Sequence, residues 1–112
     1  MNYGSSGAGT MTHLPSAAFA REFGLESSHI AYKGESPALV DVASGRTQFM
    51  ISTLSAAIAM MSDARVRALA VAAEQRSTLF PNIPTFNEAL GTRDWIMGAW
   101  QGVVVPKGVA PE

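Results

Sequence analysis

Apolar and polar residues alternate along the chain with two different periods, which predict its helices and strands. Between residues 12 and 23 the apolar positions recur three and four residues apart, which predicts a helix that ends at Gly24. Pro15 has no amide hydrogen to donate, so it fits only in the first turn of that helix. The helix is therefore expected to begin near Met11 or Thr12.

Short apolar runs predict strands between the helices. The first ends near Tyr3 or Gly4, and the others are expected over residues 29–32, 47–52, 66–73 and 95–105. The run at 66–73 has a polar residue only near its start, Arg67, which is typical of a strand covered on both faces. Because strands alternate with helices, the sequence predicts a single α/β domain in three layers, with a mostly parallel five-stranded sheet and helices on both faces.

Two further helices are predicted in the middle of the chain. Ser36 followed by Pro37 pairs a favoured N-cap with proline at the first helical position. This helix is expected to run to about Ser44 and to end at Gly45. The stretch at 54–61 is rich in alanine and methionine and predicts a helix that is largely buried.

The last part of the chain carries one strong helix signal. Thr85 and Glu88 form a capping box, TFNE, which predicts a short helix that ends at Gly91. In the strand expected after it, Gly98 and Gly102 indicate a bend, a bulge or the close approach of another backbone.

Composition narrows the class of protein. The chain has 112 residues, 47% hydrophobic and 15% charged, as expected for one folded domain. Its net charge of -1 gives no general attraction to nucleic acid or to an anionic membrane. There is no cysteine, and histidines and carboxylates do not occur at metal-site spacing, so neither a metal nor another cofactor is expected. Because a strand is expected at the very first residues, without the pattern of a secretory signal, we expect one domain of a larger protein.

The candidate chemistry lies in the stretch from Tyr3 to Leu14, YGSSGAGTMTHL. It leaves the carboxyl end of a predicted parallel strand and enters a helix N-terminus, where ligands of open α/β sheets bind. Unpaired amides and the helix dipole favour an anion there, and the glycines allow it to approach the backbone. The hydroxyl groups of Ser5, Ser6 and Thr10 would add donors. The alternative is a tight strand-to-helix turn that binds nothing.

Familiar nucleotide and hydrolase motifs do not fit this loop. A Walker loop needs Lys and then Ser or Thr after its last glycine, but Gly9 is followed by Thr10 and Met11. The dinucleotide fingerprint G-x-G-x-x-G does not match glycines at positions 4, 7 and 9. Ser5 and Ser6 lack the G-x-S-x-G spacing of an α/β hydrolase, so we do not expect an enzyme.

Other candidate residues each have two interpretations. Lys33, in the second strand-to-helix loop AYKGESP, is either a charge partner for a bound anion or a solvated cation. His13 either donates to the anion or packs against the loop. Trp95 and Trp100 either form a ligand wall or belong to the core or to a domain interface.

Five stretches together resemble a known family. They are YGSSGAGTMTHL, AYKGESPALVDVASGRTQFM, VRALAVAAEQRS, FPNIPTFNEA and WQGVVVPKGVAP. In this order they are similar to the second, inserted domain of the Bug family, the extracytoplasmic solute receptors of tripartite tricarboxylate transport systems. The resemblance covers essentially the whole chain. It departs from the family at Pro15, where alanine is usual, and at Ser52 and Thr53, where a more polar loop is usual.

The resemblance implies a function and a site. It implies one lobe of a two-domain, periplasmic-binding-protein-like receptor that closes on a small carboxylate solute and serves membrane subunits of a transporter, with the other domain absent from this chain. It places the ligand carboxylate on Ser5, Ser6, Gly7, Ala8, Gly9 and Thr10, and it closes the other side with Tyr32, Lys33 and Gly34.

An interaction module is the alternative of a different class. Without the partner domain, hinge strands and the cleft face are uncovered, and an exposed apolar patch favours self-association. The chain would then form a homodimer, with its terminal strands exchanged, and would bind no ligand of its own.

Overall fold

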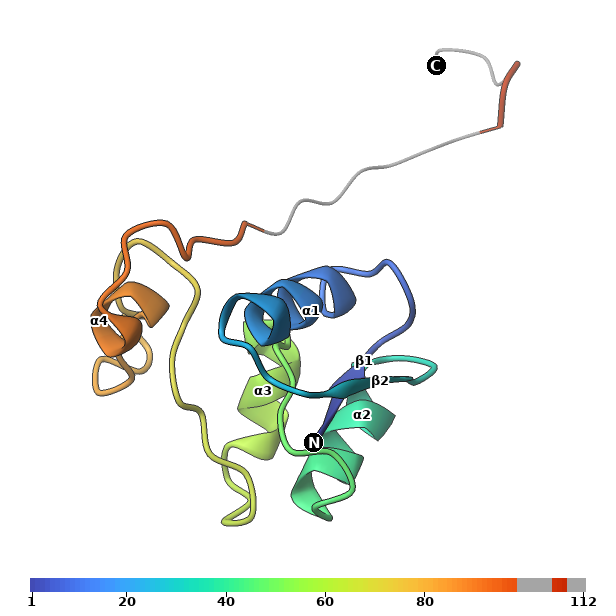
Figure 1. The fold of residues 1–112 in the computed structure, drawn as a ribbon, viewed down its shortest axis with the longest axis horizontal. Coiled ribbons are helices and arrows are strands. Elements are labelled where there is room, and N and C mark those ends of the chain that lie inside the picture. Colours follow the sequence, from blue (N-terminus) through green and yellow to red (C-terminus); the bar gives the residue numbers. More distant parts are fainter. Residues whose placement is uncertain (99–105, 109–112) are drawn as a thin grey trace.

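The computed structural model describes residues 1–98 and 106–108, and Figure 1 shows its fold. Its elements are β1 (Asn2–Ser5), α1 (His13–Glu22), β2 (Ser28–Ala31), α2 (Glu35–Ala43), α3 (Leu54–Met60) and α4 (Phe86–Leu90). Strands and helices alternate through the first four elements, which confirms the α/β class. No helix in the described part of the chain has the length and apolar character needed to cross a membrane.

β1 and β2 pair in parallel, with Tyr3 opposite His29. Side chains alternate between the two faces of a strand, and the neighbours of β1 follow that rule. The Tyr3 ring stacks towards His13 of α1, whereas a Cβ added at Gly4 would lie 3.5 Å from the Cβ of Ala38 in α2. α1 and α2 therefore cover opposite faces of the pair, as Figure 1 shows, and the expected layering of helices on both faces is present.

The five-stranded sheet is not confirmed, because the described residues contain two paired strands. The predicted strand at 47–52 is reduced to one bridge, between Tyr3 and Phe49. The predicted strand at 66–73 likewise makes one bridge, from Val71 to Thr85. An apolar run indicates burial but does not supply a neighbour, and a strand needs a continuous ladder of backbone hydrogen bonds.

The strand predicted over 95–105 falls partly outside the described residues, as do Trp100 and Gly102. Its described part, from Trp95 to Gly98, is not in a strand. Among the described residues, one long-range backbone hydrogen bond joins it to the rest of the chain, from the amide of Met97 to the carbonyl of Ala72 at 2.9 Å.

The helix boundaries agree with the sequence at α1 and differ at α2. α1 has Thr12 as its N-cap and Pro15 in its first turn, as predicted. The start predicted for α2 at Ser36 is wrong, because Gly34 is the N-cap. The positive φ of Gly34, 117°, lets the chain turn into the helix two residues earlier, and Pro37 still falls in the first turn, where no amide hydrogen is needed.

α3 and α4 form where they were expected, but α3 is not buried. Leu54 and Ile58 of α3 are 40% and 43% exposed, because this helix packs mainly against α2 rather than against the sheet. The capping box of α4 is confirmed, since Thr85 and Glu88 satisfy each other's backbone amides. Gly91 ends α4 in the left-handed region with φ 68°, as its position predicted.

Four aromatic residues join α1 to the α4 region, and we call them the aromatic cluster: Phe19, Phe23, Phe86 and Trp95. The indole of Trp95 lies between 5.7 and 6.1 Å from the three phenylalanine rings, measured between ring centroids. Trp95 is only 6% exposed. Of its two predicted roles, the described residues therefore favour the core.

Candidate functional site

Two strand-to-helix loops meet at the carboxyl end of the parallel pair. Residues 6–12 join β1 to α1, and residues 32–34 join β2 to α2. The Tyr32 amide donates to the Ser5 carbonyl at 2.9 Å, and a Cβ on Gly7 would lie 3.9 Å from the Tyr32 carbonyl oxygen. The structure thus brings together the two loops that the sequence singled out.

Three hydroxyl groups gather inside the first loop, and we call them the hydroxyl cluster: Ser6, Thr10 and Thr12. Their oxygen atoms lie 2.9 to 3.2 Å apart, and Thr12 also accepts the Ser6 amide hydrogen at 2.8 Å. Thr12 is 2% exposed, and its side chain serves the loop instead of capping α1. The cluster gives the loop a defined shape and places two half-buried hydroxyls, of Ser6 and Thr10, at its surface.

Most amides of the loop already have acceptors in the chain, so the expectation of unpaired amides is wrong for these residues. The Gly7 amide donates to the Ser5 hydroxyl at 3.1 Å, and the Gly9 amide donates to Nδ1 of His13 at 2.8 Å. The Thr10 amide makes a longer bond of 3.4 Å to the Gly7 carbonyl. Side chains of the chain itself therefore accept the amide hydrogens of Gly7 and Gly9.

The first amides of α1 are also hydrogen-bonded within the chain. The amides of His13 and Leu14 both donate to the Thr10 carbonyl at 3.1 Å. The amides of Ala8 and Met11 have no acceptor among the described residues, and both residues are exposed. Two exposed amides of this loop are therefore open, whereas four others are bonded within the chain.

Rings from four segments form a continuous stack, and we call it the polar stack: His13, His29, Tyr3 and Phe49. The two imidazoles are 3.8 Å apart between centroids with an interplanar angle of 11°, and Tyr3 lies 5.3 Å from His29. Nε2 of His29 lies 2.6 Å from the hydroxyl of Ser5, which is fully buried. Burial, and after it the neighbouring His13, lowers the pKa of His29 below its usual value.

In the second loop, Lys33 forms no ion pair among the residues that the structure describes. Lys33 is exposed, whereas the hydroxyl of Tyr32 donates to Oδ2 of Asp41 at 2.7 Å and so points towards α2. Burial and this hydrogen bond raise the pKa of the Tyr32 phenol, which keeps it protonated at neutral pH. Tyr32 therefore shapes the loop through its backbone, and Gly34 does so as the N-cap of α2.

A third junction, at Thr53, is occupied by the chain itself. The carboxylate of Glu35, the first residue of α2, accepts the Thr53 amide at 2.8 Å and the Thr53 hydroxyl at 3.0 Å. Glu35 therefore holds the amide and the hydroxyl of Thr53 at the start of α3.

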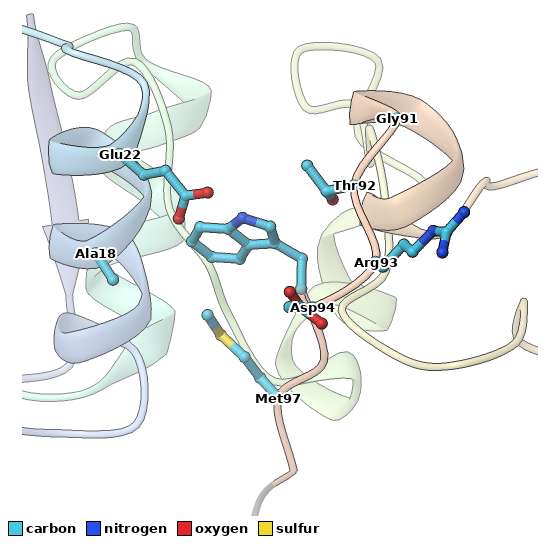
Figure 2. Close-up of a pocket in the computed structure, with 8 residues that line it drawn as sticks. Ala18, Glu22, Gly91, Thr92, Arg93, Asp94 and Met97 are labelled. Carbon is cyan, nitrogen blue, oxygen red and sulfur yellow. The ribbon is translucent and has the colours of Figure 1, made fainter.

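An open pocket of about 580 Å³ lies away from these loops, between α1 and the segment after α4. Figure 2 shows Ala18 and Glu22 of α1 on one side and Thr92, Arg93 and Asp94 on the other. Its lining carries two carboxylates and one guanidinium, together with Trp95 and Met97. This mixed set selects no particular charge in a ligand, and of the candidate residues from the sequence only Trp95 lines the pocket.

Ser5 and His29 have the separation of a nucleophile and a base but lack access to a substrate. Ser5 has no exposed surface, and its hydroxyl already contacts both the amide and the carbonyl of Gly7. Within the described residues, neither imidazole forms an ion pair and no group of acidic residues and histidines could hold a metal. The geometry supports binding through hydrogen bonds, not bond-breaking chemistry.

Sequence reasoning missed two residues that shape the loop, Thr12 and His29. The signal for His29 was available, because a parallel register that aligns Tyr3 with residue 29 also places His29 beside Ser5 on the same face. For Thr12 no pattern distinguishes an ordinary helix cap from a threonine that turns back into the preceding loop.

Comparisons with known proteins identify the family of the chain. The family described as "Tripartite tricarboxylate transporter family receptor" matches residues 1–112. A UPF0065 protein from the tcbD-tcbE intergenic region of Pseudomonas sp. (strain P51) is 37% identical over 96% of the chain. Protein BugT of Bordetella pertussis is 35% identical over 93%. The chain spans 32% of the length of each of these two relatives.

A solved structure from R. palustris, determined with adipate, has a similar fold. It aligns with a TM-score of 0.80 and 32% sequence identity, over 87% of this chain and 32% of its own. The five stretches quoted above thus lie in a chain that matches one third of a larger protein, both in sequence and in structure.

Proposed function

Since the chain belongs to the tripartite tricarboxylate transporter receptors, a family of solute-binding receptors and not of enzymes, we propose that it is the carboxylate-gripping half of a periplasmic receptor. The observation that carries the proposal is the loop at 6–12, which sets two open amides and two half-buried hydroxyls at the carboxyl end of parallel strands. The rest of such a receptor, about two thirds of its length, supplies the other half of the binding cleft. The whole receptor delivers its solute to membrane subunits of the transporter.

The ligand carboxylate is captured in steps. It first meets the amide of Ala8 and the hydroxyl of Ser6, with Lys33 nearby as the charge partner. The Thr10 hydroxyl donates to the Gly7 carbonyl at 2.7 Å and turns to the ligand only by giving up that bond. The carboxylate then replaces the Gly7 carbonyl as the acceptor of the Thr10 amide, and Nδ1 of His13 as the acceptor of the Gly9 amide. Each exchange replaces a neutral acceptor with a charged one, and hydrogen bonds to charged groups are roughly twice as strong. Ser5, Gly7, Tyr32 and Gly34 support this geometry from behind.

Adipate is a suitable probe, because it is a small dicarboxylate and was found with the similar R. palustris protein. In a titration followed by amide resonances, adipate is expected to shift residues 5–13 and 32–34 and to leave the open pocket near Trp95 unchanged. Shifts confined to the pocket, or no shifts with millimolar adipate, would contradict the assignment.

Two glycines form a matched pair for this test. Gly9 and Gly45 have φ of 76° and 80°, and a Cβ on either meets nothing within 4 Å. Gly9→Ala and Gly45→Ala should therefore cost a similar strain, about 1–2 kcal/mol. Only Gly9→Ala reorients an amide of the loop at 6–12, so only this variant should weaken adipate binding, by roughly tenfold or about 1.4 kcal/mol. Equal affinities for the two variants would remove Gly9 from the site.

Self-association is the second candidate, and the exposed side chains of Leu54 and Ile58 favour it. They lie four residues apart on one face of α3 and are 40% and 43% exposed. If this face joins two copies in a homodimer, light scattering should give twice the monomer mass, and Ile58→Glu should return it to the monomer. A monomer at every concentration would exclude this candidate.

A further inference from the structure

The two histidines of the chain both control glycine amides in the candidate loop. His13 begins α1 and His29 lies in β2, and their rings stack at 3.8 Å. His13 holds the Gly9 amide directly. His29 contacts the Ser5 hydroxyl, which in turn accepts the Gly7 amide. Each imidazole therefore acts, directly or through Ser5, on one glycine amide of the loop.

The bond to Gly9 fixes the tautomer of His13. A backbone N–H can only donate, so Nδ1 of His13 must accept and carries no proton. The proton of the neutral ring is then on Nε2. Protonation of His13 adds a hydrogen at Nδ1, which would set two N–H groups against each other at 2.8 Å and break this bond.

The groups around the polar stack limit how many of its two imidazoles can be protonated at once. β1 contributes Tyr3 and the segment at 47–52 contributes Phe49, while the loop at 6–12 has no ionisable side chain. Neither imidazole forms an ion pair within the described ranges 1–98 and 106–108. Two cations 3.8 Å apart repel each other, and burial lowers the pKa of His29, so His29 is the ring that stays neutral.

We propose that His13 is a positioning residue whose protonation releases the Gly9 amide from the chain. Neutral His13 keeps the loop closed on itself through the bond from Gly9 to Nδ1. Protonated His13 frees that amide and places a positive charge beside it. Its consequence for binding rests on the proposed function: a carboxylate binds more tightly as the pH falls from 8 to 6, where a carboxylate of ordinary pKa near 4.3 stays ionised.

The coupling is measured without any ligand, on the 112-residue chain. Amide and imidazole nitrogen resonances are followed from pH 8 to pH 5.5. At pH 8, Nδ1 of His13 should show the unprotonated shift, and the Gly9 amide proton should then move with the same midpoint as His13. A Gly9 resonance that stays fixed while His13 titrates overturns the proposal, as does an Nδ1 that is protonated at pH 8.

Three variants separate His13 from its neighbour. His13→Gln keeps an acceptor for Gly9 but does not titrate, so the Gly9 response to pH should vanish. His13→Phe keeps the stacked ring without an acceptor and should leave Gly9 in its released state at every pH. His29→Gln should preserve the Gly9 response, because the bond from the Gly9 amide to Nδ1 of His13 is unchanged. If His29→Gln alone lost the response, His29 and not His13 would control the Gly9 amide, and the proposal would be overturned.

Adipate affinity at pH 8 and pH 6 gives the second readout. One hydrogen bond within the chain is released, so binding should tighten roughly three- to tenfold at pH 6, and His13→Phe should bind equally at both values. If Gly9 follows His13 but adipate binds at neither pH, the proposed function fails and the coupling stands. If adipate binds equally at both and Gly9 ignores His13, the coupling is overturned and the proposed function stands.

Discussion

The two ends of α1 face different surroundings. Its N-terminus enters the polar stack, whose imidazoles also contact the amide of Gly9 and the hydroxyl of Ser5. Its C-terminal half enters the aromatic cluster, where Phe19 meets Trp95 and Phe86 edge to face at 5.7 and 5.8 Å. The first set of rings depends on hydrogen bonds and protonation, whereas the second depends on apolar contact alone.

This difference assigns separate tasks to the two ends. The aromatic cluster attaches the α4 region, which Figure 1 shows set apart from the two strands, to the rest of the chain. The polar stack lies under the candidate loop and determines which of its amides are held. We therefore expect substitutions in the cluster to change the free energy of unfolding most, and substitutions around the stack to change the loop.

Removing the largest ring of the cluster should have the greatest effect. Trp95 is 6% exposed, so Trp95→Ala leaves a cavity among three phenylalanines and should lower the free energy of unfolding by about 3–5 kcal/mol. Urea unfolding followed by circular dichroism measures this loss. Ile96→Ala is the neighbouring control, since Ile96 is 45% exposed and should change stability by less than about 0.5 kcal/mol. If both variants lost the same free energy of unfolding, the aromatic cluster would not be what attaches the α4 region.

The hydroxyl cluster should give an intermediate effect at the other end. Thr12→Val keeps the shape of this buried residue but leaves the Ser6 amide without its acceptor, which should cost about 1–3 kcal/mol. Hydrogen exchange at Ser6 should become faster, and Thr12→Ser should restore most of the protection. Thr78→Val, at an exposed position, serves as the control. Unchanged exchange at Ser6 would contradict the role given to Thr12.

What the sequence could predict follows the same division between local and distant contacts. The capping box at Thr85 and the start of α1 near Pro15 were predicted correctly, because each depends on atoms within one helical turn. The strands at 47–52 and 66–73 were not, because pairing depends on a partner far along the chain. Leu69, in the middle of the second run, is 63% exposed, so even its apolar character did not secure burial.

The candidate site shows the same limit on a smaller scale. The position of the loop followed from glycines and hydroxyls adjacent in sequence. The acceptors of its amides did not, because Thr12 must turn back into the loop and His29 reaches Ser5 only through the parallel register. Small residues in a strand-to-helix turn predict where an anion can approach, but not which side chain already holds the donors.

Acid should weaken the polar-stack end of α1 and leave the aromatic-cluster end unaffected, and this is the smallest of the three effects. The pKa of His29 is lowered in the folded chain, so as the pH falls below about 6.5 the unfolded chain gains its proton first. The free energy of unfolding should therefore decline between pH 7.5 and pH 5.

Urea unfolding at the two ends of this range measures the decline in parent chain and variants. His29→Gln should flatten the slope, since glutamine keeps a polar partner for Ser5 without titrating. Trp95→Ala should keep the parent slope at a lower overall stability, because no group in the aromatic cluster titrates. If His29→Gln and the parent chain lose the same stability in acid, carboxylates elsewhere are responsible and the polar stack is not sensitive to protons. If Trp95→Ala changes the slope, the two ends of α1 are coupled and the division of tasks between them fails.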